Sequence, residues 1–95
     1  MAKGRKHLSD DQMQAIARAL ADPRRFAILQ QIASQDCTAC GSLAAQKVLS
    51  PATISHHLKE LADAGLIDVQ REGRCASLSL HRDVWSAYLE QLAKL

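Results

Sequence analysis

Residues 49–74 contain a helix whose two ends are both marked in the sequence. Ser50 is a good N-cap residue. Pro51 suits the first helical position, because a backbone N–H there would have no partner within the helix and proline has no N–H to lose. Gly65 fits the left-handed position that follows many helices, since glycine adopts that conformation without steric cost. The sequence therefore predicts a helix that is confined between Ser50 and Gly65.

The faces of this predicted helix differ in chemistry. Ile54, Leu58 and Leu61 recur at positions i, i+4 and i+7, so they form one buried stripe. The opposite face carries small and polar side chains: Ala52, Thr53, His56, Lys59 and Asp63. A helix that enters the DNA major groove leads with its N-terminal half, where short side chains allow close approach. This pattern is typical of a recognition helix.

After Gly65 the apolar period changes from helical to two, over residues 66–71 and 74–80. This change predicts a two-stranded hairpin with Glu72 and Gly73 in its turn. Arg71 and Arg74 bracket the tip of the hairpin. They either contact DNA phosphates or are simply solvated charges beside a turn.

The run P-A-T-I-S-H-H-L-K-E-L-A-D-A-G-L-I, followed by R-E-G-R and a strand, resembles the ArsR/SmtB family of winged-helix repressors. The earlier run D-P-R-R-F-A-I-L resembles that family's D-P-x-R-x-x-I-L. The resemblance covers roughly residues 8–95. It implies a winged helix-turn-helix fold, a homodimer, and binding to double-stranded DNA at an inverted-repeat operator.

We therefore expect a mainly α fold with a β-hairpin wing, a winged helix-turn-helix of five helices and two strands. The helices are expected to start at Ser9, at Asp22-Pro23, near Ser42, after Ser50 and near Arg82. Ninety-five residues allow one domain, residues 8–95, for DNA binding and dimerisation. Residues 1–7 form a basic arm that is either disordered or touches DNA backbone.

Charge supports DNA binding only through its local placement. Three of the twelve Lys and Arg residues lie before residue 7, which leaves nine basic against ten acidic residues. The predicted DNA-binding residues are those of the recognition helix and the hairpin tip: Ser50, Ala52, Thr53, Ser55, His56, Lys59, Arg71 and Arg74.

Other classes of protein fit less well. The chain has no glycine-rich phosphate loop and no evident acid–base pair, and its CxxC follows a predicted helix instead of a strand, so we expect no enzyme. No apolar run approaches the length of a membrane span, which predicts a cytoplasmic protein with no membrane partner. The alternative to a DNA-binding regulator is a protein of another functional class, a winged-helix module that binds other proteins and has no effector.

Cys37 and Cys40 lie three positions apart at a predicted helix entrance, where the helix dipole can lower the pKa of a thiol. Family members that sense trivalent arsenic carry a cysteine pair near the start of this helix, commonly as C-x-C, so one extra residue stands here. We predict a repressor that releases its operator when a thiophilic metal or metalloid such as As(III) binds this pair. Cys75 is the less certain third ligand. A thiol redox switch and inert cysteines are the alternatives.

Zinc is not expected at either of two places. A zinc site normally needs four ligands, and no second cysteine or histidine pair accompanies Cys37 and Cys40. On the last helix, His81, Asp83 and Glu90 lack the second histidine of the family's zinc site.

Overall fold

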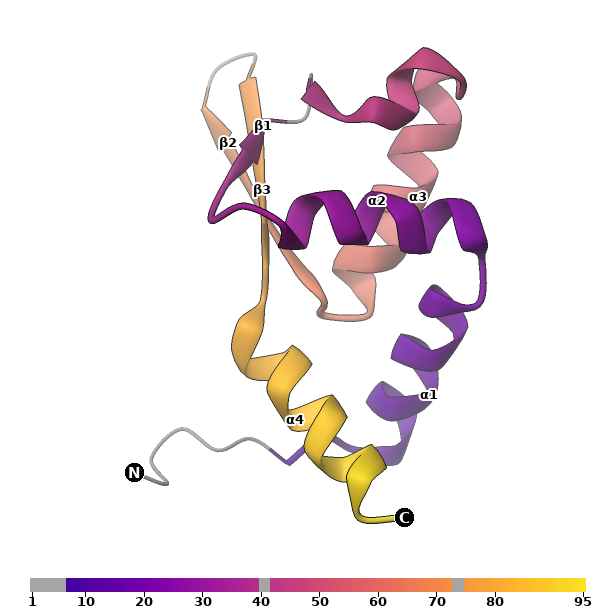
Figure 1. Cartoon of the computed structure of the whole chain (residues 1–95), viewed down its shortest axis with the longest axis vertical. Coiled ribbons are helices and arrows are strands. Elements are labelled where there is room, and N and C mark those ends of the chain that lie inside the picture. Colours follow the sequence, from indigo (N-terminus) through magenta and orange to yellow (C-terminus); the bar gives the residue numbers. More distant parts are fainter. Residues whose placement is uncertain (1–6, 40–41, 73–74) are drawn as a thin grey trace.

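The computed structural model describes residues 7–39, 42–72 and 75–95 (Figure 1). In chain order its elements are α1 (Asp10–Leu20), α2 (Pro23–Ala33), β1 (Thr38–Ala39), the 3₁₀ helix η2 (Ala44–Lys47), α3 (Pro51–Asp63), β2 (Ile67–Glu72), β3 (Cys75–Leu80) and α4 (Arg82–Ala93).

The molecule is elongated, with extents of 38 × 26 × 20 Å. Figure 1 shows α2 crossing its middle, with the N-terminal end of α3 and the upper part of the β2–β3 hairpin at one end of the long axis. The α1 and α4 helices lie at the other end. The fold therefore places the N-terminal end of the predicted recognition helix away from α4, while the C-terminal end of that helix meets α1 through the Gln12–Ala64 hydrogen bond.

Three of the predicted helix starts are confirmed by side-chain caps. The Ser9 hydroxyl accepts a hydrogen bond from the Gln12 N–H at 3.1 Å, and Asp22 caps α2. The Ser50 hydroxyl accepts from the Thr53 N–H at 3.2 Å, directly before Pro51. Such caps satisfy N–H groups that have no partner within the helix, and each is worth about 1 kcal/mol.

The predicted helix end at Gly65 is also confirmed. Gly65 has φ 83°, and the Leu66 N–H donates to the Leu61 carbonyl at 3.0 Å, which closes α3 in a Schellman-type turn. A Cβ at this position would lie 2.7 Å from Nε2 of Gln12. Both the backbone conformation and the close approach of α1 therefore favour glycine here.

The sheet is antiparallel with strand order β1-β3-β2. In the hairpin the register runs from Ile67 opposite Leu80 to Glu72 opposite Cys75. Glu72 thus belongs to β2, not to the turn as predicted, and the connecting residues 73–74 lie outside the described residues. The hairpin itself, the predicted wing, is confirmed.

The expected count of five helices and two strands is wrong, because the described residues form four α-helices and three strands. The predicted helix near Ser42 is only a four-residue 3₁₀ turn. Leu43 at its N-cap offers no capping side chain, and Oε1 of Gln31 caps the Ala44 N–H instead. The additional strand, β1, has two residues, too few to show any period in the sequence.

Aliphatic side chains from the α-helices and the hairpin make up most of the core, and among the Phe, Trp and Tyr residues only Tyr88 is buried. Phe26 of α2 is 39% exposed. The buried stripe of α2 is Ile28, Leu29 and Ile32, and Phe26 lies at the edge of that stripe.

Leu8 is the first buried side chain among the described residues, being 3% exposed. The side-chain amide of Gln91 holds the Leu8 backbone by two hydrogen bonds, accepting from its N–H at 2.6 Å and donating to its carbonyl at 3.1 Å. Residues 1–6 lie outside the described residues, so the predicted arm stays a prediction. Among the described helices, none is both long enough and apolar enough to cross a membrane.

His57, on α3, is a buried polar side chain of the core. It is 3% exposed, and neither ring nitrogen has a hydrogen-bond partner among the described residues. Burial lowers the pKa of His57; the carboxylate of Asp22 opposes this shift, whereas Arg25 and Arg24 add to it. The folded protein therefore holds this imidazole in its neutral form.

We predict that His57 makes the protein less stable in mild acid. Below about pH 6.5 the unfolded chain binds a proton at this imidazole that the folded state, with its lowered pKa, does not bind. Urea unfolding at pH 7 and at pH 5 should show that His57→Leu loses part of this pH dependence. The control His56→Leu, at an exposed neighbour, should keep this pH dependence. An equal change in unfolding free energy between pH 7 and pH 5 in the wild type and both variants would contradict the prediction.

Candidate nucleic-acid interface

A cleft of about 660 Å³ separates α3 from the hairpin. Its lining combines alkyl groups with a hydroxyl and two cations: Ser55, Leu58, Lys59, Ala62, Val69, Arg71, Ala76 and Leu78. Three of the predicted DNA-binding residues, Ser55, Lys59 and Arg71, thus come together across two elements. The cleft carries positive charge at its walls and apolar surface inside.

The outward face of α3 agrees with the predicted exposure. Ala52, Ser55 and His56 are exposed, whereas Thr53 is half-buried. The Thr53 hydroxyl lies 2.9 Å from the Ser50 hydroxyl, and the same Ser50 oxygen caps the helix. Ser50 and Thr53 therefore use part of their hydrogen-bonding capacity within the protein, while His56 presents a free face to solvent.

Lys59 is paired on the surface of α3. Its Nζ lies 2.7 Å from Oδ2 of Asp63, one helical turn on, and this hydrogen bond raises the pKa of the lysine. The two side chains are 71% and 60% exposed, so the pair is worth little in water. A phosphate oxygen can replace the carboxylate at small cost, which leaves Lys59 free to contact DNA.

The hairpin contributes Arg71 to the cleft. Arg71 lies on β2 opposite Ala76 of β3 and is exposed. Val69 lines the same cleft, two residues earlier on the same face of the strand. The predicted contact residue Arg74 lies outside the described residues.

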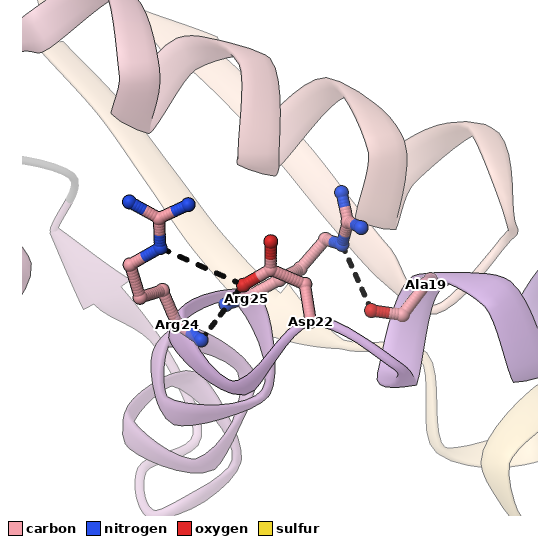
Figure 2. A network of polar contacts seen from close by, with 4 residues as sticks. All are labelled: Ala19, Asp22, Arg24 and Arg25. Atoms are coloured by element: carbon pink, nitrogen blue, oxygen red, sulfur yellow. Dashed lines mark hydrogen bonds and ion pairs between the residues drawn. The ribbon is translucent and has the colours of Figure 1, made fainter.

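The start of α2 carries a second group of charges (Figure 2). The Asp22 carboxylate accepts hydrogen bonds from the backbone N–H groups of Arg24 and Arg25. Both bonds lower the pKa of this carboxyl, and the bond from Arg25 has the larger effect. Figure 2 shows the two guanidinium groups on either side of this carboxylate. Nε of Arg25 donates to the Ala19 carbonyl at 2.8 Å and so joins α2 to α1, whereas Arg24 is more exposed.

The sequence analysis did not predict the roles of two residues, Val69 in the lining of the cleft and Gln31 in the positioning of η2. Val69 shares a strand face with Arg71, and the period of two in the hairpin was the available signal. Gln31, on α2, donates to the Ser42 carbonyl at 2.9 Å and accepts from the Ala44 N–H at 2.8 Å, so it fixes η2 against α2. No sequence pattern indicated that contact, because it joins positions eleven and thirteen residues apart.

The cysteines are only partly described. Cys37 is exposed and directly precedes β1, so the predicted helix entrance is absent at that residue. Ala39 pairs with Ser77, two residues from Cys75, so the segment of Cys37 runs beside the strand that Cys75 begins. Cys40 lies outside the described residues. In the part of the chain that the structure describes, no three His, Cys, Asp or Glu residues are grouped to hold a metal.

Comparison with known proteins places this geometry in a family. A family model for a helix-turn-helix domain matches residues 20–70. The chain is 35% identical over 83 residues to the HTH-type transcriptional regulator YceK of Bacillus subtilis (strain 168), which covers 85% of this chain and 83% of that protein. It is 38% identical over 76 residues to the transcriptional repressor SmtB homolog of Synechocystis, covering 77% of this chain and 57% of that protein.

Solved structures of similar fold support the same family assignment. An ArsR family transcriptional regulator superposes with a TM-score of 0.80 at 26% identity, over 94% of this chain and 91% of that one. The homodimeric winged helix-turn-helix DNA-binding domain of a possible ArsR-family regulator from Mycobacterium bovis gives a TM-score of 0.70 at 28% identity, over 99% and 90% of the two chains. Such proteins are DNA-binding regulators and not enzymes. The chain belongs to the ArsR/SmtB family of winged helix-turn-helix transcriptional regulators.

Proposed function

We propose that this regulator is a cytoplasmic repressor that binds an inverted-repeat operator as a homodimer. The observation that carries the proposal is the cleft between α3 and the hairpin, which gathers Ser55, Lys59 and Arg71. Its lining residues come from α3, β2 and β3. Two copies joined at the α1 and α4 end would present two reading helices to successive half-sites.

The two walls of the cleft have different roles in this proposal. The N-terminal half of α3 enters the major groove, where His56 reaches a base edge and Ala52 permits close approach. Lys59 and Arg71 contact phosphates on either side and supply affinity that does not depend on sequence.

We predict that His56→Ala weakens binding to the operator by roughly 1–3 kcal/mol, with little effect on random DNA, because it loses a base contact. Arg71→Ala should weaken binding to both DNAs and lower the salt slope by about 1, because it loses a phosphate contact. The operator is first selected from random DNA, and affinities are then measured across salt concentrations.

Lys94→Ala is the control, since Lys94 is an exposed cation at the C-terminal end of α4, which lies at the other end of the molecule from the start of α3 (Figure 1). It should leave both affinities unchanged. Wild-type binding by His56→Ala and Arg71→Ala together would remove this winged-helix docking mode.

The dimer is supported by an exposed apolar stripe on α4. Leu89 and Leu92 are 46% and 40% exposed, and with Trp85 they follow the i, i+4, i+7 spacing of one helix face. Large apolar side chains at such exposure favour association. The Mycobacterium bovis relative is a homodimer.

We predict that Leu92→Glu produces a monomer, because a charge in an apolar interface loses its hydration without gaining a partner. Lys94→Glu is the control: it adds a carboxylate about 180° around α4 from Trp85 and should stay dimeric. Analytical ultracentrifugation gives the mass, and circular dichroism checks that both variants fold. A wild-type monomer at micromolar concentration would count decisively against the homodimer.

We further propose that Cys37 and Cys40 bind a thiophilic metal or metalloid such as As(III), which releases the operator. Exposure of Cys37 supports this proposal, because a ligand can reach the thiol. The pairing of β1 with β3 supports Cys75 as a third ligand, because it brings the two segments alongside each other. The segment also lies shortly before η2 and α3, so a change in it can reach the reading helix.

We predict that arsenite lowers operator affinity of the wild type by about 5- to 150-fold, the usual range of coupling between two sites. Cys37→Ser and Cys40→Ser should bind the operator normally but fail to release it, since serine offers no soft thiolate. Cys75→Ser shows whether the strand supplies a third ligand. Release by a Cys37→Ser/Cys40→Ser double variant, equal to that of the wild type, would mean that the pair is structural.

The same variants separate the alternatives. A thiol redox switch would release the operator with peroxide and regain it with a dithiol, without arsenite. A winged-helix module that binds only protein would fail to enrich any sequence from random DNA.

A further inference from the structure

A second, smaller cavity lies on α2, away from the cleft at the wing. It has a volume of about 280 Å³ and separates α2 from η2 and from the turn that leads into α3. Six of its eight lining residues are alkyl and two are polar: Arg24, Ala27, Ile28, Gln31, Ala44, Ala45, Val48 and Leu49. Val48 is 83% exposed, so this apolar space opens to solvent beside an exposed apolar side chain.

The α2 wall of the cavity has a cation at one end and an amide at the other. Arg24, Ala27, Ile28 and Gln31 follow the i, i+3, i+4, i+7 spacing, so they form one stripe along the helix. Both functions of the Gln31 amide are used, by the Ser42 carbonyl and the Ala44 N–H. Gln31 therefore closes its end of the cavity, with one donor and one acceptor site of its amide already engaged by the protein.

Arg24 differs from Gln31 because the terminal nitrogens of its guanidinium group remain available to a ligand. Its Nε lies 3.8 Å from Oδ1 of Asp22, and its side chain is 61% exposed. Figure 2 shows the two terminal nitrogens pointing away from that carboxylate. A guanidinium presents its donors in a planar fork that matches a carboxylate, so the free end of Arg24 is suited to bind one.

We infer that this cavity binds a small molecule with a compact apolar body and a single carboxylate, and that it is a second effector site. The apolar body lies against Ala27 and Ile28 on one side and Val48 and Leu49 on the other, where it removes alkyl surface from water. The carboxylate pairs with Arg24. A ligand without negative charge gains only the first of these two interactions.

Occupancy reaches DNA binding through the chain itself. Val48 and Leu49 directly precede Ser50, which caps α3, so a ligand in the cavity contacts both α2 and the entrance of the reading helix. The regulatory part of this inference rests on the proposed operator binding, whereas ligand binding can be measured without DNA.

Benzoate and its neutral counterpart benzamide are the probes. In ¹H–¹⁵N spectra of the full-length protein, benzoate should cause saturable shifts at residues 24–31 and 44–49, with Kd on the order of 1 mM. Arg24→Gln should weaken benzoate binding by roughly tenfold or more, the usual effect of losing a charge-assisted hydrogen bond, and leave benzamide binding unchanged. Arg18→Gln is the charge-matched control and should bind benzoate as the wild type does.

Ala27→Phe provides a second variant, because Ala27 is exposed and its replacement fills the cavity without disturbing the core. It should abolish the binding of both probes in a folded protein. Saturating benzoate should also change operator affinity of the wild type by about fivefold or more. Shifts that do not saturate, that lie elsewhere, or that persist in Arg24→Gln would overturn the binding site, and unchanged operator affinity at saturation would overturn its role as an effector site.

Discussion

The left-handed turn at Gly65 is the constraint on which the DNA-facing end depends. With φ at 83° at Gly65, the chain passes from α3 to β2 through only three residues, 64–66. Leu66, which is fully buried, donates its N–H to the Leu61 carbonyl and accepts from the His81 N–H at 2.8 Å. One residue thus ties the end of α3 to the start of the wing and to the entrance of α4. The angle between the two walls of the cleft is set by this junction.

The same junction holds the first helix in place. Nε2 of Gln12 donates to the Ala64 carbonyl at 3.4 Å, and its amide nitrogen occupies the space that a side chain at Gly65 would need. Gln91 of α4 in turn holds the backbone of Leu8. These polar contacts anchor α1 and α4 while Leu89 and Leu92 stay exposed. Because the anchors do not use the apolar stripe of α4, that stripe remains available to a second copy in the proposed dimer.

Local chemistry explains which parts of the fold could be predicted from the sequence. Ser9, Asp22, Ser50 and Gly65 act on their immediate neighbours, so these three helix starts and this helix end were predicted correctly. Contacts between distant segments have no such signal: β1 pairs with a strand about forty residues later, and Gln31 caps the Ala44 N–H from thirteen positions earlier in the chain.

Helical period also leaves residues at the edge of a stripe undecided, and His57 is more deeply buried than Leu58, which belonged to the predicted stripe. For the candidate site, residue identities came from the recognition-helix pattern. The meeting of Ser55 with Arg71 across the cleft required the tertiary structure, because it depends on the angle set at Gly65.

The short strand β1 gives the proposed effector segment two connections to the DNA-reading end. On one side, Thr38 and Ala39 pair with Leu78 and Ser77, and β3 in turn pairs with β2, which carries Arg71. On the other side, Gln31 holds Ser42 and Ala44 just ahead of α3. A displacement near Cys37 therefore acts on the wing through sheet hydrogen bonds and on the recognition helix through η2. Because η2 is only a four-residue 3₁₀ turn, it yields more readily than the sheet, and the recognition helix is the more responsive of the two walls.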